Sequence, residues 1–399
     1  GLFGQNLIYN IVTAGLYYYF QNVICLPAMA LGWIFAIARI WDAINDPMMG
    51  SIVDKTKSKW GKCKPYLLFA PLVVCVITCV AFLNGNYAVA KQDDNTVAMA
   101  LIVAWAAVSY ILWGMSYTAG DVPLWGVISR MSEVEKDRAN LIALARIVAS
   151  IAAGLGIVSV VALSQAANKQ FGESENAQKG FIVVGIAMTV IASLLFECAG
   201  LGVKERVPNS EETKTMKESF VLMWKCKPFR RLMISGILRA PLQLLATVVM
   251  TLFTYYYCDG DLTNAFSNGK TFLTIVIVGG AFFIGQFGAT AVCPALMKKI
   301  DVKKFYNLTA LSAVPMALLF VTYLIAPAEL TKIGWVVIDG ILLLFAGVGF
   351  GAVAVCQSVM ISDCIDYEEY NSGYRPDGIF FSGQSFITKF SAGISSIIS

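Results

Sequence analysis

Residues 27–53, PAMALGWIFAIARIWDAINDPMMGSIV, form an apolar stretch that carries two acids, one base and one amide near its middle. A helix of this length crosses a bilayer, because about 20 residues at 1.5 Å each span the hydrocarbon core. Charged groups at that depth cost several kcal/mol unless they are paired or bind an ion, and they therefore indicate function. Arg39, Asp42 and Asp46 have i, i+3, i+7 spacing, which places them within roughly 60° of one helix face. The stretch predicts a membrane helix with an ion site on one face.

The rest of the chain has the composition of a membrane protein. Of its 399 residues 57% are hydrophobic and 14% are charged, and the mean hydropathy is +0.68. A soluble domain has about 25% charged residues. We therefore predict an all-α, polytopic membrane protein with spans at residues 7–25, 27–53, 65–84, 96–128, 140–165, 180–202, 230–258, 271–297, 304–326, 333–360 and 378–399.

The longest loop with an excess of basic residues divides these spans into six before it and five after it. We predict an N-terminal six-helix bundle at 1–202, a cytoplasmic central loop at 203–229 and a truncated C-terminal bundle at 230–399. The chain starts at Gly1 and stops at Ser399 inside an apolar run, so we expect a fragment of a six-plus-six protein that lacks its twelfth span. Many transporters consist of two such halves around a site at the middle of the membrane.

Basic residues concentrate in alternate loops. The loop after the quoted stretch contains Lys55, Lys57, Lys59, Lys62 and Lys64, whereas the loop on the other side, near 85–95, contains only Lys91. The excess of lysine and arginine in cytoplasmic loops predicts that the N-terminus lies in the cytoplasm. We expect a multi-pass protein of the plasma or inner membrane. In the same basic loop, Asp54 can bond to a neighbouring loop.

Several function classes are disfavoured by composition. The sequence has no histidine, which removes histidine metal sites, Ser-His triads and histidine proton relays. Its ten cysteines include no CxxC pair, and no basic run is interleaved with aromatic residues as nucleic-acid binding requires. We expect no cofactor, no enzymatic activity, no nucleic-acid partner and a monomeric protein.

Two groups of residues can bind ligands. Asp42, Asn45 and Asp46 offer oxygen ligands that suit a small hard cation, and the two carboxylates can instead bind protons; the residues alone leave Na⁺ and H⁺ open. Thr118, Asp121 and Trp125 repeat the i, i+3, i+7 face in a second span. A hydroxyl, a carboxylate and an indole on one stripe match a sugar, although Trp125 is also explained as an aromatic residue of the membrane interface.

Other charged residues lie within the predicted spans. Arg146 can donate to a sugar oxygen or pair with Asp121. Lys389 lies at a depth similar to that of the acids, which favours one shared polar cavity over separate local pairs. Arg239 and Asp339 are weaker candidates, for which local pairing or a position at a span end is the simpler interpretation.

Four segments resemble a known family. They are RIWDAINDPMMGSIVDKTKSKWGKCKPY (39–66), YILWGMSYTAGDVPLW (110–125), ISDCIDYEEY (361–370) and GQSFITK (383–389). They resemble the glycoside–pentoside–hexuronide:cation symporters, the melibiose permease group of the major facilitator superfamily, and lie in order along nearly the whole chain. The resemblance implies the major facilitator fold.

The resemblance also implies site residues. It implies a cation (Na⁺) site made of Asp42, Asn45, Asp46 and Thr118. The sugar contacts that it implies are Asn6, Asp121, Trp125, Arg146, Gln384, Ser385, Thr388 and Lys389. Lys389, with Arg39, is the predicted link between the two sites.

The chain departs from the melibiose permease at two places. Gln5 and Asn6 stand where that permease has a Lys-Asp pair that contacts sugar, and Ala354 stands in place of a tryptophan. These changes leave the sugar open among a xyloside, another glycoside and a hexuronide. We therefore expect import of a glycoside or related sugar with Na⁺ or H⁺ by alternating access. A lipid or drug transporter of the same fold and a non-transporting sugar sensor are the alternatives.

Overall fold

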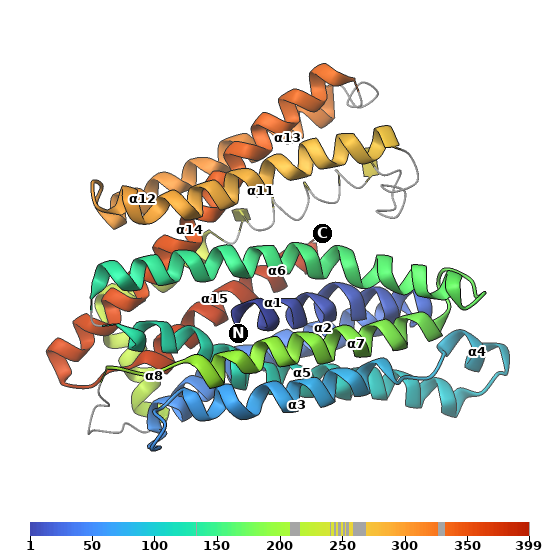
Figure 1. Cartoon of the computed structure of the whole chain (residues 1–399), viewed down its shortest axis with the longest axis horizontal. Helices are drawn as coiled ribbons and strands as arrows, with labels where there is room; N and C mark the ends of the chain where they lie inside the picture. The colour runs from blue at the N-terminus through green and yellow to red at the C-terminus, as the bar shows by residue number, and fades with distance from the viewer. Residues whose placement is uncertain are drawn as a thin grey trace. The chain divides into compact units, whose positions relative to one another are not determined.

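The computed structural model describes residues 1–132, 134–207, 216–239, 241, 242, 245, 249, 252, 255–257, 269–325 and 332–398. The described residues form helices joined by short loops (Figure 1). The α-helices are α1 (Leu2–Asn10), α2 (Ala28–Lys55), α3 (Lys64–Phe82), α4 (Tyr87–Gln92), α5 (Thr96–Met131), α6 (Glu135–Gln170), α7 (Gln178–Gly202), α8 (Met216–Lys225), α9 (Lys227–Leu238), α11 (Gly269–Met297), α12 (Val302–Leu308), α13 (Ala313–Ile325), α14 (Ile333–Ser372) and α15 (Asp377–Ile398).

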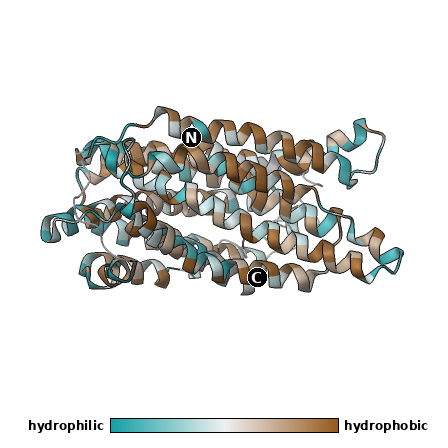
Figure 2. Ribbon diagram, turned by 90° about the horizontal axis from the view of Figure 1, so that it is seen from below, coloured by the Kyte–Doolittle hydropathy of each residue, from teal (hydrophilic) through white to brown (hydrophobic). Residues whose placement is uncertain are grey.

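Eight helical stretches among the described residues are long and apolar enough to cross a membrane. Figure 2 shows hydrophobic residues along the middle of the helices and hydrophilic ones at many of their ends and loops. The predicted all-α membrane architecture is therefore confirmed. The predicted span 230–258 lies partly outside the described residues.

Some helix boundaries differ from the predicted ones. Helix α14 continues to Ser372, beyond the predicted end at residue 360, and so includes the acidic segment 361–370. The span expected at 7–25 is helical from Leu2 and contains π-helical segments at Ile11–Leu16 and Tyr19–Val23. A 3-10 turn, Thr309–Ser312, separates α12 from α13, and Pro315, three residues after the turn, lacks the N–H that would bond to the carbonyl of Leu311 in an α-helix.

The chain forms two compact units. The first contains Gly1–Glu133, Val148–Met223 and Glu368–Phe386, and the second contains Val134–Ile147, Trp224–Tyr367 and Ile387–Ser399. Helices α6, α14 and α15 each contribute to both units. Each unit is described by itself below.

In the first unit, α3 packs against α5 and α7, α1 packs against α7, and α2 packs against α5. Glycine permits close contact between α1 and α7, since a Cβ on Gly4 would lie 2.3 Å from the carbonyl oxygen of Ala192. Both α2 and α5 contain an internal proline just after an acid, Pro47 after Asp46 and Pro123 after Asp121. A proline has no N–H for the carbonyl four residues earlier, so each helix is locally weakened beside its acid.

The second unit has its own apolar core, formed by α11, α13, α14 and described residues between 241 and 257. Buried members include Val278, Leu319, Tyr323, Val336 and Leu343. Val336 and Leu343 are seven residues apart, or two helical turns, so one stripe of α14 faces this core.

Candidate cation and sugar site

Asp46 lies at the centre of a hydroxyl-lined contact between α2 and α5. Its side chain is fully buried, and Thr118 Oγ1 donates to its Oδ1 over 2.9 Å. The hydroxyl of Ser385, which the first unit contributes from α15, donates to the other oxygen over 2.8 Å. The structure thus brings together Asp46 and Thr118, two of the predicted cation ligands. Ser385, a predicted sugar contact, bonds to the same carboxylate.

Asp42 lies one turn before Asp46 on α2 and is also buried. A Cβ on Gly114 would be 3.4 Å from Asp42 Oδ1, so Gly114 and Thr118 of α5 face the two acids of α2 in register. Arg39 forms an ion pair with Asp42 at 3.6 Å. The fourth predicted ligand, Asn45, is buried, and its Nδ2 has no hydrogen-bond partner among the described residues. Two carboxylates and an amide thus lie within 1.5 turns of α2, beside the Thr118 hydroxyl of α5.

Asp121 is the centre of a second polar group on the same helix α5. Its Oδ1 accepts a bond from Gln5 Nε2 at 2.6 Å and another from the indole Nε1 of Trp125 at 3.1 Å. The alternative interpretation, that Trp125 is an aromatic residue of the membrane interface, does not explain its hydrogen bond to Asp121. Asn6 donates to Gln5 Oε1 at 2.5 Å, so the residue that bonds directly to Asp121 is Gln5, which was not among the predicted sugar contacts.

An aromatic cluster adjoins both groups and was missed by sequence analysis. Trp113 stacks on Tyr117 with ring centroids 5.1 Å apart, and Tyr9 of α1 lies 5.5 Å from Tyr117. Tyr117 also accepts a hydrogen bond from Gln5 and interacts electrostatically with Asp42, Asp46 and Asp121. The signal was the four-residue repeat Trp113, Tyr117, Asp121, Trp125, which places these residues on one stripe of α5.

Three predicted contacts fall in the second unit. Arg146 Nη2 donates to Ser358 Oγ at 2.7 Å, and both residues belong to this unit. Lys389 is buried, and Thr388 is exposed. Gln384 belongs to the first unit and is buried. The predicted joining of Arg146 and Lys389 to the acids of the first unit stays a prediction.

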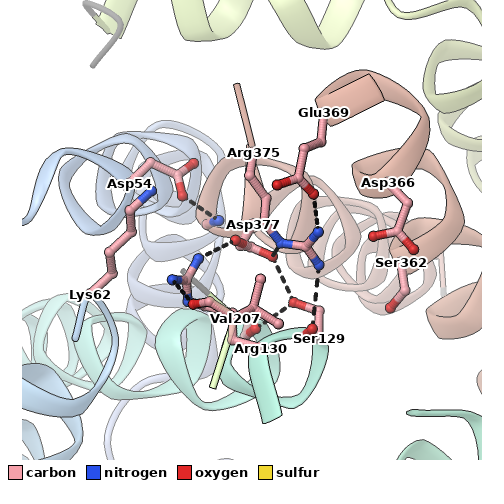
Figure 3. Close-up of polar contacts among 12 residues, drawn as sticks. Asp54, Lys62, Ser129, Arg130, Val207, Ser362, Asp366, Glu369, Arg375 and Asp377 are labelled. Atoms are coloured by element: carbon pink, nitrogen blue, oxygen red, sulfur yellow. Dashed lines mark hydrogen bonds and ion pairs between the residues drawn. The ribbon is translucent and has the colours of Figure 1, made fainter. Parts of the chain in front are cut away.

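A buried ion-pair cluster in the first unit involves the segment 375–379 at the start of α15. Arg130 at the end of α5 pairs with Asp377 at 2.7 Å, and Arg375 pairs with the same carboxylate at 3.1 Å (Figure 3). Ser129 donates a further hydrogen bond to Asp377 at 2.7 Å. Asp377 is 1% exposed, so its carboxylate is stabilised by the guanidinium groups of Arg130 and Arg375 rather than by contact with water.

Carboxylates also cap two helices of this region. Asp54 accepts bonds from the backbone N–H groups of Gly378 and Ile379, at 2.8 and 2.9 Å, and so caps α15. This confirms that Asp54 bonds to a neighbouring segment. Glu205 accepts N–H bonds from Cys63 at 2.8 Å and Lys64 at 3.1 Å and caps α3 in the same way. Both contacts place carboxyl oxygens at the N-terminal end of a helix, where backbone N–H groups lack partners within the helix.

The thiol of Cys63 lies inside this region. Burial raises its pKa well above the usual range, and the nearby Glu205 carboxylate raises the pKa further. Cys63 therefore stays a neutral thiol and is a small hydrophobic member of the core.

Comparison with known proteins identifies the family. The family model described as "MFS/sugar transport protein" matches residues 1–399. The chain belongs to this family. It is 26% identical to the isoprimeverose transporter of Lactiplantibacillus pentosus, in an alignment that covers 98% of this chain and 76% of that protein. It is 28% identical to the inner membrane symporter YicJ of Escherichia coli strain K12, over 96% of this chain and 76% of that protein.

A solved structure shares the fold of this MFS sugar transport protein. The proton:xylose symporter XylE, bound to 6-bromo-6-deoxy-D-glucose, aligns with 100% of this chain and 87% of its own, with a TM-score of 0.61 and 15% sequence identity. At that identity the likeness shows the fold alone. Family and fold together confirm the predicted major facilitator architecture and the predicted class of multi-pass sugar transporter.

Proposed function

We propose that this protein imports a glycoside, pentoside or hexuronide in symport with a monovalent cation, Na⁺ or H⁺, by alternating access. The family match supports sugar transport. The names of similar proteins support symport, since they include the putative glycoside/cation symporter YagG of E. coli, which is 28% identical over 94% of this chain. The residues of the first unit supply chemistry for both ligands.

The observation that carries the proposal is the sharing of helix α5 by two polar groups. Thr118 serves Asp46, while Tyr117, the residue before it, is bonded into the group around Asp121. A cation at Asp42 and Asp46 would draw the Thr118 hydroxyl lone pairs toward itself. It would also cancel negative charge that Tyr117 and Asp121 otherwise experience. Cation binding thereby prepares the sugar site, and by linkage sugar must raise cation affinity by the same factor.

The sugar in this proposal lies beside Asp121, with its hydroxyls bonded to the carboxylate and its apolar face on an aromatic ring. Trp125 donates to that carboxylate, and Tyr117 accepts a bond from Gln5, which also donates to the carboxylate. Arg146, Gln384, Thr388 and Lys389 complete the proposed sugar contacts, and Arg39 and Lys389 the proposed coupling. We further propose that the protein lies in the plasma or inner membrane as a monomer with its N-terminus in the cytoplasm, and that it has no cofactor and no enzymatic activity.

Counterflow in proteoliposomes tests the proposal. Liposomes loaded with one unlabelled sugar from a panel of xylosides, other glycosides and hexuronides are diluted into the labelled sugar. Uptake is then driven either by a Na⁺ gradient at constant pH or by a pH gradient without Na⁺. We expect counterflow for at least one sugar and accumulation under one of the two gradients.

The alternatives give different results in the same assay. A sugar sensor would bind sugar but show no counterflow. A lipid or drug transporter would show neither sugar binding nor counterflow, and buried carboxylates such as Asp46 and Asp121 disfavour an apolar cargo. Counterflow without any response to either gradient would leave sugar transport standing and refute symport.

A further inference from the structure

Another buried acid, Asp339, lies in the second unit and is not used by the proposed transport mechanism. It is the seventh residue of α14, and its side chain is fully buried. Its neighbours on the same stripe of the helix, Val336 and Leu343, both belong to the apolar core of this unit. An ionised carboxylate at such a place costs several kcal/mol unless a cation lies beside it.

No cation is found beside Asp339 among the described residues. The groups that interact with its carboxylate are Tyr257, Thr322 and Tyr323. Of these, Tyr257 and Tyr323 are titratable, and both have neutral hydroxyl groups at ordinary pH. The residues that α11 contributes to the described core are apolar, Val278 among them.

The hydrogen bonds around Asp339 require one more hydrogen than the hydroxyls supply. Tyr257 O–H lies 2.8 Å from Asp339 Oδ2, and Thr322 Oγ1 lies 2.9 Å from Oδ1. Thr322 Oγ1 also lies 2.8 Å from the carbonyl oxygen of Leu319. A threonine hydroxyl has a single hydrogen, which can point directly at the carboxylate or at the carbonyl but not at both. One of these two contacts would join two oxygens without a hydrogen if Asp339 were ionised.

A proton on Asp339 completes the chain. Oδ1–H then donates to Thr322 Oγ1, Thr322 O–H donates to the Leu319 carbonyl, and Tyr257 O–H donates to the acid carbonyl Oδ2. Each contact has one hydrogen, and the buried group has no net charge. We propose that Asp339 is a proton-binding site of the second unit, held neutral at ordinary pH and distinct from the cation ligands Asp42 and Asp46.

Infrared difference spectroscopy of the liposome-embedded protein tests this directly. At about pH 7 the spectrum of wild type minus Asp339→Asn should contain a carboxylic-acid C=O band that shifts in D₂O. Other protonated acids cancel in the difference. Asp301→Asn is the matched control, because Asp301 is an exposed helix cap of the same unit and should contribute only carboxylate bands.

Two results would overturn the proposal. One is a wild-type minus Asp339→Asn difference with carboxylate bands alone. The other is a set of Asp339 carboxylate bands that shift when Na⁺ is added at constant pH, which would make the site a Na⁺ site.

Tyrosine variants test the same site with the acid in place. Tyr257→Phe removes the bond to the acid carbonyl and should move the C=O band to higher frequency. Tyr323→Phe removes a buried hydroxyl that has no hydrogen-bond partner among the described residues, so the band should stay nearly where it is. A C=O region unchanged by Tyr257→Phe contradicts the proposal even if Asp339→Asn fails to fold.

The pH dependence of unfolding gives an independent measurement. The folded chain would hold a proton that an unfolded aspartate releases, so raising the pH should lower wild-type thermal stability. Asp339→Asn keeps an N–H donor toward Thr322 and an acceptor for Tyr257. It should unfold near the wild-type temperature at about pH 7 and lose the decrease in stability that Asp339 causes as the pH rises above about 4, the pKa of an unfolded aspartate. Equal decreases with rising pH in wild type and variant would count against the proton site.

Discussion

Replacing Thr118 with valine removes one hydroxyl from the proposed cation site and leaves its shape unchanged. Thr118 is fully buried, and valine has nearly the same volume, so no cavity forms. The hydroxyl lies 2.9 Å from the Asp46 carboxylate, where it can serve an ion bound to that carboxylate. A hydrogen bond to a charged group contributes about 1.5–3 kcal/mol. We therefore expect Thr118→Val to raise the cation concentration for half-maximal sugar uptake by roughly 10- to 100-fold.

The assay is sugar uptake into proteoliposomes as a function of the coupling cation, with sugar binding measured by calorimetry at saturating cation. Sugar affinity at saturation should change little, since Asp121 and Trp125 remain in place. Ser116→Ala is the matched control: Ser116 lies on the same helix, and its hydroxyl donates to its own helix at the Trp113 carbonyl. An unchanged cation dependence in Thr118→Val, with normal expression, would refute the assignment of Thr118 as a cation ligand.

Variants at three further residues test the proposed roles. Trp125→Ala should weaken sugar affinity by about 1–2 kcal/mol more than it weakens cation affinity, and Trp125→Phe should recover part of this loss; calorimetry measures both. Asp46→Cys should retain sugar binding and downhill flux but lose cation-driven accumulation, and persistent accumulation would place coupling elsewhere. Lys389→Ala should abolish concentrative uptake, and accumulation at the wild-type level would contradict its proposed link to the acids.

The sequence predicted the architecture because a bilayer constrains it strongly. Apolar length and the absence of stable unpaired backbone in lipid predict helices almost regardless of detail. The sequence could not predict where α14 ends. Its last residues, near Glu368 and Glu369, are polar, and an apolar span is expected to stop before them although the helix continues. The π-helical segments near Ile11 and Tyr19 were equally inaccessible, because they depend on packing between helices rather than on local preference.

The site was predictable where its members share a helix. Asp42, Asn45 and Asp46 follow helical spacing, and Thr118 was added by resemblance. The contact between Gln5 and Asp121 joins residues 116 positions apart, and only packing reveals it. Asp54 caps α15 by accepting a bond from Gly378, which is 324 positions away in the chain. The sequence predicted only that Asp54 bonds to a neighbouring loop.

Helix α5 directly links the two ligand sites that we propose. Gly114 and Thr118 are one turn apart and face the acids of α2, while Tyr117 and Asp121, each three residues further along, lie about 60° around the helix from them. The two pairs are mechanically connected, because both belong to the continuous helix α5. Any rotation of α5 that improves the contact of Thr118 with a cation at Asp46 also turns Asp121 relative to the sugar. In the proposed mechanism, coupling therefore requires no long pathway, because both proposed sites lie on adjacent faces of one helix.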